Sequence, residues 1–159
     1  MKHLLIDIDQ QRLTVYNNHS LMQSYPVSTA KNGAGELKDS GQTPRGLHQV
    51  IAIIGRNMPE NSVFVARRPT GEIYSETLSQ RYPDRDWILS RILWLSGKEN
   101  GKNRHGKVDT LSRYIYIHGT PPTEPVGVPL SHGCIRMRNS DVIELSEMVE
   151  PGVSVLIKG

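Results

Sequence analysis

Short runs of apolar and β-branched residues, separated at regular intervals by turn residues, are the feature that most constrains the fold of this chain. Residues 3–8 and 12–16 flank the polar segment 9–11 and predict a β-hairpin. A third run covers residues 20–29, and Pro26 within it predicts a sheet edge or a bulge. Runs of this length and spacing are typical of a sheet sandwich or a small barrel.

The rest of the chain continues the strand pattern around one long loop. Residues 31–46 hold four glycines and one proline, which predicts a loop, and loops of this length are usually functional or flexible. Residues 140–149 predict a short helix with Asn139 or Ser140 as its N-cap. Further strands are predicted over residues 47–54, 63–66, 113–117 and 153–157, a turn over residues 69–71, and a polar loop over residues 97–107.

Residues 84–96 give the clearest helix prediction. Asp84 or Asp86 can cap its N-terminus, and its apolar residues cover most of the helix circumference. We therefore expect this helix to pack on the sheet or to cover a cleft. Trp87 and Trp94 within it are interpreted as core packing rather than as a ligand-binding pair.

The chain length of 159 residues predicts a single domain over residues 1–159 that is mainly β, with one or two packed helices. Nineteen Lys and Arg against sixteen Asp and Glu give a net charge of +3. Nucleic-acid binding proteins combine a basic face with a reading motif. No such motif is present, so the charges are interpreted as a solvated surface, and a mild positive bias suits anionic substrates.

The N-terminal sequence predicts a cytoplasmic protein if Met1 is the native start. Only Leu4, Leu5 and Ile6 form an apolar run there, before Asp7 interrupts it. A secretory signal needs about 7–15 apolar residues and a membrane helix about 20. A chain trimmed from an exported precursor would instead be periplasmic.

Two segments carry residues suited to nucleophilic chemistry. His118 and Gly119 end the predicted strand 113–117, and the segment 131–139 reads Ser-His-Gly-Cys-Ile-Arg-Met-Arg-Asn around Cys134, the only cysteine. A thiol becomes a good nucleophile near neutral pH when a base or a positive charge lies nearby and the sulfur is accessible. The residues around Cys134 that meet this requirement are His118, His132, Arg136 and Arg138.

Other interpretations of Cys134 remain open at this stage. A lone cysteine in an intracellular protein is usually a small buried hydrophobe. His118, His132 and Cys134 could also bind a metal, although a fourth ligand and the close spacing of zinc modules are lacking. Gly133 allows a carbonyl group to approach the backbone closely, and the amides of Gly133 and Cys134 could form an oxyanion hole.

The pattern Ile-His-Gly-Thr followed by Ser-His-Gly-Cys-Ile-Arg-Met resembles the active-site signature of the L,D-transpeptidase catalytic domain family of the YkuD type. The resemblance extends over essentially the whole chain. It includes the opening hairpin, the Thr-Pro-Arg-Gly segment at residues 43–46 and the terminal strand. The region between about residues 55 and 111 is the least typical part.

The resemblance implies a role for each matching residue. Cys134 is the expected nucleophile, and His118 the expected general base and acid, with its ring oriented by the Gly119 carbonyl. His132 and Gly133 are expected to shape the pocket and the oxyanion hole, and Arg136 to bind a substrate carboxylate. Ser131 and Asn139 are expected to hold the loop and to cap the helix that follows. The resemblance implies a β-sandwich-like domain that needs neither a metal nor a cofactor.

The resemblance also implies a substrate and a reaction. Cys134 would attack the bond between the L-centre of diaminopimelate and the terminal D-residue of a peptidoglycan stem peptide. Without a signal peptide, we expect a cytoplasmic L,D-carboxypeptidase that trims tetrapeptides of soluble muropeptides to tripeptides during wall recycling. The alternatives are an L,D-transpeptidase that forms cross-links or exchanges D-amino acids, and a non-catalytic muropeptide-binding protein. No nucleic acid or membrane partner is expected.

Overall fold

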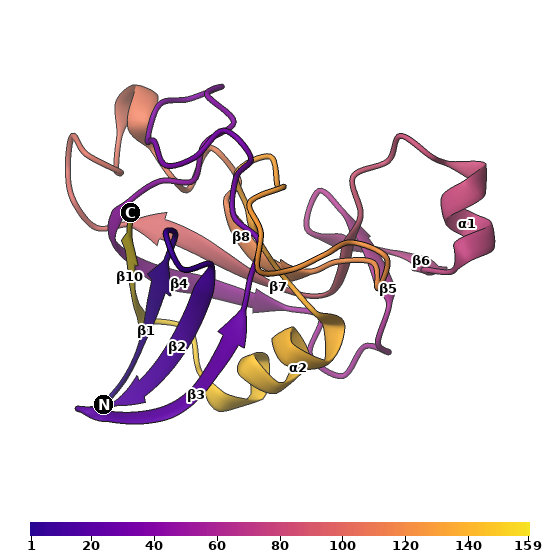
Figure 1. The fold of residues 1–159 in the computed structure, drawn as a ribbon, viewed down its shortest axis with the longest axis horizontal. Helices are drawn as coiled ribbons and strands as arrows, with labels where there is room; N and C mark the ends of the chain where they lie inside the picture. Colours follow the sequence, from indigo (N-terminus) through magenta and orange to yellow (C-terminus); the bar gives the residue numbers. More distant parts are fainter.

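The computed structural model describes all 159 residues, and its strands form one continuous sheet in the order β3-β2-β1-β10-β4-β7-β5-β6, with β8 and β9 joined to it through β7 (Figure 1). The predicted class, mainly β with one or two packed helices, is confirmed. The elements are β1 (Lys2–Asp7), β2 (Arg12–Asn17), β3 (Ser20–Pro26), β4 (Gly46–Ile54), β5 (Ser62–Val65), β6 (Arg68–Ile73), α1 (Glu76–Arg81), β7 (Ile88–Gly97), a 3-10 turn (Gly106–Val108), β8 (Tyr116–Gly119), β9 (Ile135–Met137), α2 (Asn139–Met148) and β10 (Ser154–Lys158).

The N-terminal hairpin forms as predicted. Leu4 and Ile6 of β1 are fully buried while their neighbours are partly exposed, which is the alternation expected of a strand with one face on the core. β10 lies parallel to β1, with Leu4 opposite Val155. β3 ends at Pro26, so the predicted run 20–29 is a strand only over its first part, and the chain beyond it forms isolated bridges.

The helix predicted over residues 84–96 is wrong, because residues 88–97 form strand β7. Leu93 pairs with Ile53 of β4 on one edge of β7 and with Ile117 of β8 on the other. The strand is therefore central, and most of its side chains are buried. A strand covered on both faces has the same continuous apolar sequence as a buried helix, so periodicity does not separate the two.

The turn predicted over residues 69–71 is also wrong, since these residues belong to β6. The chain reverses instead at Ala66 and Arg67, which adopt φ angles of 49° and 64°. The strand predicted over residues 113–117 begins only at Tyr116, because Tyr114 at φ 57° interrupts the extended backbone. Nothing in the sequence pattern predicted α1 or β9.

The predicted C-terminal helix and strand are confirmed as α2 and β10, each within one residue of the expected bounds. The N-cap of α2 is Arg138 rather than Asn139 or Ser140, and its side chain makes no capping hydrogen bond. Asn139 is not free to cap because its amide group is part of a buried hydrogen-bond network with Ser90 and Thr120.

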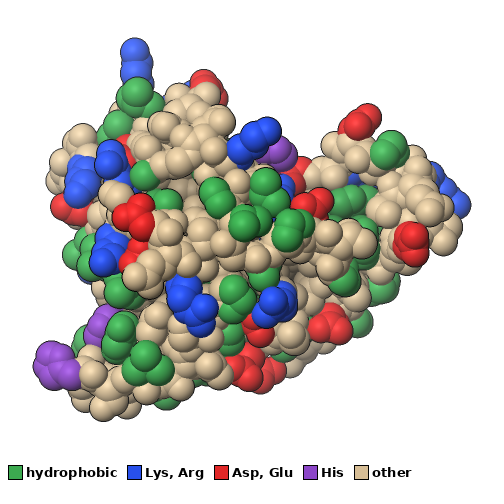
Figure 2. Space-filling model, viewed as in Figure 1, with side chains coloured by type: hydrophobic (Ala, Val, Ile, Leu, Met, Phe, Trp, Pro, Cys, Tyr) green, Lys and Arg blue, Asp and Glu red, His purple; other side chains and the backbone are tan.

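The main hydrophobic core lies between the sheet and α2, where Val142 and Leu145 are fully buried. β5, β6 and α1 form an arm at the right of Figure 1, and Trp87 is buried in a smaller cluster there with Val63 and Leu89, as its interpretation as core packing predicted. Figure 2 shows acidic and basic side chains interspersed over the viewed face. No helix of the chain has the length and apolarity needed to cross a bilayer.

His48 is fully buried and lies outside the cavity around Cys134. We predict that the protein loses stability when the pH is lowered. His48 Nδ1 lies 2.9 Å from the Gly46 carbonyl and therefore carries the proton, while Nε2 accepts from Thr110 Oγ1 at 2.9 Å. Burial lowers the pKa of His48 from 6.5 to about 4. Because the unfolded chain binds this proton more readily, the free energy of unfolding falls as the pH drops from 6.5 to 4, by about 3 kcal/mol.

Urea unfolding at pH 7 and at pH 4 tests this prediction. His48→Asn removes the titrating ring, so its pH-dependent loss should be smaller than that of the wild type by about 3 kcal/mol. The stability of the variant at pH 7 is the control, because any difference from the wild type at that pH reports the lost hydrogen bonds and not the titration of the ring. An equal pH dependence in the two proteins would contradict the assignment.

Candidate active site

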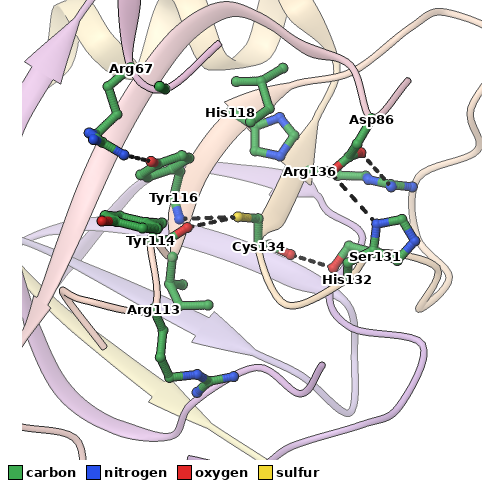
Figure 3. A pocket seen from close by; sticks show the side chains of 13 residues that line it. Arg67, Asp86, Arg113, Tyr114, Tyr116, His118, Ser131, His132, Cys134 and Arg136 are labelled. Carbon is green, nitrogen blue, oxygen red and sulfur yellow. Dashed lines mark hydrogen bonds and ion pairs between the residues drawn. The ribbon is translucent and has the colours of Figure 1, made fainter. Parts of the chain in front are cut away.

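A cavity of about 460 Å³ opens around Cys134 and brings together residues from four parts of the chain. His118 comes from β8, Cys134 and Arg136 from the segment that leads through β9, Asp86 from the approach to β7, and Arg67 from the β5–β6 turn. Figure 3 shows these side chains around one opening. The sequence predicted seven site residues. His118, Ser131, His132, Cys134 and Arg136 line the cavity, whereas Gly119 and Gly133 are not among its lining residues.

Cys134 is held as a neutral thiol. Its Sγ accepts a hydrogen bond from the Tyr116 amide at 3.3 Å and donates one to the Tyr114 carbonyl at 3.5 Å (Figure 3). Burial, with a smaller contribution from the Asp86 charge, raises the pKa of Cys134 to about 12, against the opposing effects of the Tyr116 hydrogen bond and the positive charges of Arg136 and Arg113. The thiol therefore needs a base at the moment of reaction.

His118, which lines the same cavity, is the candidate for that base. The ring is almost fully buried, and its Nδ1 lies 2.6 Å from the Gly119 carbonyl oxygen. Since a carbonyl only accepts, Nδ1 carries the proton and Nε2 holds a lone pair. Burial lowers the pKa of His118, against the opposing effects of the Gly119 hydrogen bond and the Asp86 charge, so the imidazole is neutral at neutral pH.

Gly119 is required by close packing as well as by its carbonyl. A Cβ at this position would overlap Asn139 Oδ1 and lie 2.5 Å from the Leu89 carbonyl oxygen. Asn139 is fixed there because Ser90 Oγ donates to its Oδ1 at 2.7 Å, and its own Nδ2 donates to the Thr120 carbonyl at 3.1 Å. The histidine and its backbone anchor are thus locked between β7 and the start of α2.

The loop before Cys134 is tied down by two hydroxyl groups. Thr43 Oγ1 donates to the Gly133 carbonyl at 2.9 Å, and Ser131 Oγ donates to the Cys134 carbonyl at 2.5 Å. Gly133 adopts φ +133°, a backbone conformation that L side chains rarely adopt. Its amide donates to Ser131 Oγ at 3.2 Å, whereas the Cys134 amide makes no hydrogen bond within the chain. The Cys134 amide is therefore the free donor of the predicted oxyanion pair.

Arg136 is already paired in this structure. Its Nη2 lies 3.3 Å from Asp86 Oδ1, and its Nη1 lies 3.9 Å from Glu124 Oε2 and donates to the Leu130 carbonyl at 3.4 Å. The other oxygen of Asp86 lies 3.6 Å from Nδ1 of the exposed His132. Asp86, which the sequence suggested as a helix cap, instead bridges two of the predicted site residues.

An aromatic and cationic wall forms the opposite side of the cavity. Arg67 Nη1 donates to the Tyr116 hydroxyl at 2.9 Å, and its guanidinium lies 4.4 Å from the Tyr114 ring centre and 4.9 Å from that of Trp94. Sequence reasoning missed Arg67, because a turn residue far along the chain carries no local signal of such a role. The aromatic-rich run just before His118 was the only hint of this wall.

The metal alternative finds no support in the geometry. No three His, Cys, Asp or Glu side chains lie close enough together to hold an ion. What the arrangement can do is transfer an acyl group, because it pairs a thiol with a neutral imidazole and a free backbone donor beside an open cavity.

A cleft with this thiol and histidine on a mainly β fold defines a cysteine acyl-transfer type of site, and comparison with known proteins identifies the family. The model of the YkuD family, the L,D-transpeptidase catalytic domain, matches residues 1–157. The chain belongs to this enzyme family.

Relatives and solved structures agree with this membership. The chain is 47% identical over 155 residues to the putative L,D-transpeptidase YkuD of Bacillus licheniformis, covering 97% of the chain and 64% of the relative. It is 28% identical over 156 residues to the YkuD protein of Bacillus subtilis, covering 98% and 65%. The chain thus spans slightly less than two thirds of the length of these relatives.

The fold similarity extends to more distant structures. L,D-transpeptidase 3 from Mycobacterium tuberculosis, in complex with a faropenem-derived adduct, superimposes with a TM-score of 0.60 at 17% identity, covering 99% of this chain and 60% of that one. The L,D-transpeptidase LdtMt1 in complex with imipenem gives a TM-score of 0.57 at 17% identity, covering 99% and 58%. At this identity the match establishes the fold.

The raised pKa of Cys134 predicts slow alkylation of the folded protein. An ordinary thiol has a pKa of about 8.5, so a pKa of about 12 leaves roughly a thousandfold less thiolate at pH 7. The rate of iodoacetamide labelling, followed by mass spectrometry, should rise steadily between pH 7 and pH 10 without a plateau. Labelling in urea should restore the rate of an ordinary thiol. A plateau below pH 8 in the folded protein would contradict a neutral resting thiol.

Proposed function

We propose that this chain is a cysteine acyl transferase that cleaves the L,D bond between diaminopimelate and the terminal D-residue of peptidoglycan stem peptides. The observation that carries the proposal is the neutral pair of Cys134 and His118 on one cavity, with the His118 ring fixed by its hydrogen bond to the Gly119 carbonyl. Membership of the L,D-transpeptidase family supports the substrate class.

The first half of the proposed reaction forms a thioester. The lone pair on His118 Nε2 takes the thiol proton as Cys134 Sγ attacks the carbonyl carbon of the scissile bond. The developing oxyanion accepts from the Cys134 amide, and the Gly133 amide can join once it turns from Ser131. Collapse of the tetrahedral adduct breaks the C–N bond, and His118 returns the proton to the departing amine of the D-residue.

Hydrolysis of this thioester is the first candidate for the second half. Water needs no binding site of its own, whereas an amine acceptor must be held in line with the thioester. His118 takes a proton from the water as its oxygen attacks the thioester carbonyl carbon. The C–S bond then breaks, and His118 returns the proton to the sulfur, which leaves a tripeptide and the free thiol. The proposed net reaction is therefore L,D-carboxypeptidation, as the trimming of soluble muropeptides in wall recycling requires.

Transpeptidation is the second candidate, and a second hollow favours it. A depression of about 620 Å³ shares Arg113, Tyr114, Ile115 and His132 with the thiol cavity. A second stem peptide could lie there and present its amine to the thioester. The relatives also carry the name L,D-transpeptidase.

Incubation of the purified protein with a disaccharide-tetrapeptide, followed by mass spectrometry, tests the proposal. Tripeptide alone indicates hydrolysis, while a cross-linked dimer or a D-amino-acid exchange product indicates transpeptidation. Cys134→Ala and His118→Gln should each lower kcat/KM by at least about 10³-fold, because each removes one member of a pair that acts as a unit. Turnover that survives in Cys134→Ala would refute the nucleophile assignment. An absence of turnover in the wild type would leave the non-catalytic muropeptide-binding alternative, which calorimetry would test.

Reaction with a carbapenem is an independent test of the thiol. Two fold relatives are described with imipenem and with a faropenem-derived adduct. We expect imipenem to acylate Cys134 with a one-to-one mass increase, since opening the strained β-lactam ring needs the same thiol, base and oxyanion donor. Cys134→Ala, matched in fold by circular dichroism, should show no adduct. An adduct on that variant would place the acylation elsewhere.

A further inference from the structure

A third hollow, distinct from the one lined by Arg113 and Tyr114, lies beside the thiol cavity and is lined by charges of both signs. It encloses about 400 Å³ and shares Asp86, His132 and Arg136 with the thiol cavity. Its other charged lining residues are Lys31, Asp84, Arg85 and Glu124, of which Arg85 is held in an ion pair with Glu72 at 2.7 Å. A ligand whose reacting carbonyl sits at Cys134 can therefore extend a side chain into this hollow.

The charge balance of the hollow disfavours a ligand with a single charge. The Arg136 side chain is only 10% exposed, so its guanidinium is fixed between the carboxylates of Asp86 and Glu124. A ligand with only a carboxylate would approach Arg136 but be repelled by the carboxylates of Asp86 and Glu124. A ligand with only an ammonium would pair with those carboxylates but leave Arg136 and Lys31 without a new anionic partner. Lys31 makes no ion pair within the chain, which leaves it available to an anionic group.

We propose that Lys31, Asp86, Glu124 and Arg136 form a zwitterion subsite that binds a side-chain end carrying both an ammonium and a carboxylate. The ammonium lies against Asp86 and Glu124, and the carboxylate against Arg136 and Lys31, so that each charge of the ligand meets its opposite. The inference rests on the proposed function, in which the third residue of the stem peptide, diaminopimelate, has such an end.

This assignment makes Asp86 a specificity-determining residue and changes the role expected for Arg136. An arginine that bound a substrate carboxylate alone would lose part of that attraction to the neighbouring Asp86 and Glu124. With an ammonium beside them, the same carboxylates become attractive. The subsite should therefore discriminate against stems in which either charge of the diaminopimelate end is masked.

Three tetrapeptide stems test the subsite. One has free diaminopimelate, the second has its side-chain carboxylate amidated, and the third has its side-chain amine acetylated. We expect the wild type to prefer the free stem over either masked stem by about fivefold in kcat/KM, mainly through KM, as for a partly exposed ion pair. Equal turnover of the three stems would overturn the proposal.

Matched variants assign each charge to its partner. Asp86→Asn should reduce the discrimination against the acetylated stem, and Lys31→Gln the discrimination against the amidated stem, each with little effect on the other ratio. The exposed Asp9→Asn, on the β1–β2 turn, is the control for loss of one charge. If both variants change the two ratios alike, or if discrimination follows the C-terminal carboxylate of the D-residue, the assignment is overturned.

Failure of the subsite can be separated from failure of the proposed function. Imipenem carries no diaminopimelate end, so adduct formation reports the thiol chemistry alone. An adduct with equal turnover of the stems overturns the subsite and keeps the function. Calorimetry of the three stems with Cys134→Ala reports binding alone. If Cys134→Ala binds the three stems in the expected order of affinity while the wild type turns none of them over, the proposed function is overturned and the subsite is supported.

Discussion

Strand β7 supports the cavity around Cys134, because it pairs with β4 and β5 on one edge and on the other with β8, which in turn pairs with β9. The register shift between Leu89 and Ile92 lies at Ser90, whose φ of 72° turns its hydroxyl toward Asn139. That bulge brings the β7 backbone against Gly119, where only a glycine fits. The Gly119 carbonyl is thus held beside His118, and its 2.6 Å hydrogen bond with Nδ1 favours one tautomer of a ring that has no carboxylate as hydrogen-bond partner.

Cys134 and His118 are both uncharged in the resting site, and in the proposed reaction their charges separate only after substrate binds. Burial lowers the pKa of His118 and raises that of Cys134, so both groups are neutral before substrate binds. The positive charges of Arg113 and Arg136 lower the pKa of Cys134 and thus oppose the effect of burial. A thiol of this kind is protected from chance electrophiles, and it becomes reactive when a bound carbonyl group lets the proton move to His118.

Sequence patterns predicted the elements that depend only on residues close together in the chain. The alternation of Leu4 and Ile6 predicted β1, and the motif around His118 and Cys134 predicted two residues that line the same cavity. The central strand β7 was mistaken for a helix because burial on both faces removes the period of two. Asp86 and Arg67 lie at the cavity only because strands far apart in the chain pair with each other. The residues next to them in the sequence therefore give no indication of their positions.

The hydrogen bonds that hold the segment before Cys134 join residues far apart in the chain. Thr43 and Gly133 are 90 residues apart, and Ser28 Oγ accepts from the Leu130 amide across 102 residues. Closing such loops costs chain entropy that is recovered only when the surrounding strands are in register. We therefore expect the segment around Cys134 to take its shape only after these strands have paired, and Cys134 to react as an ordinary thiol until then.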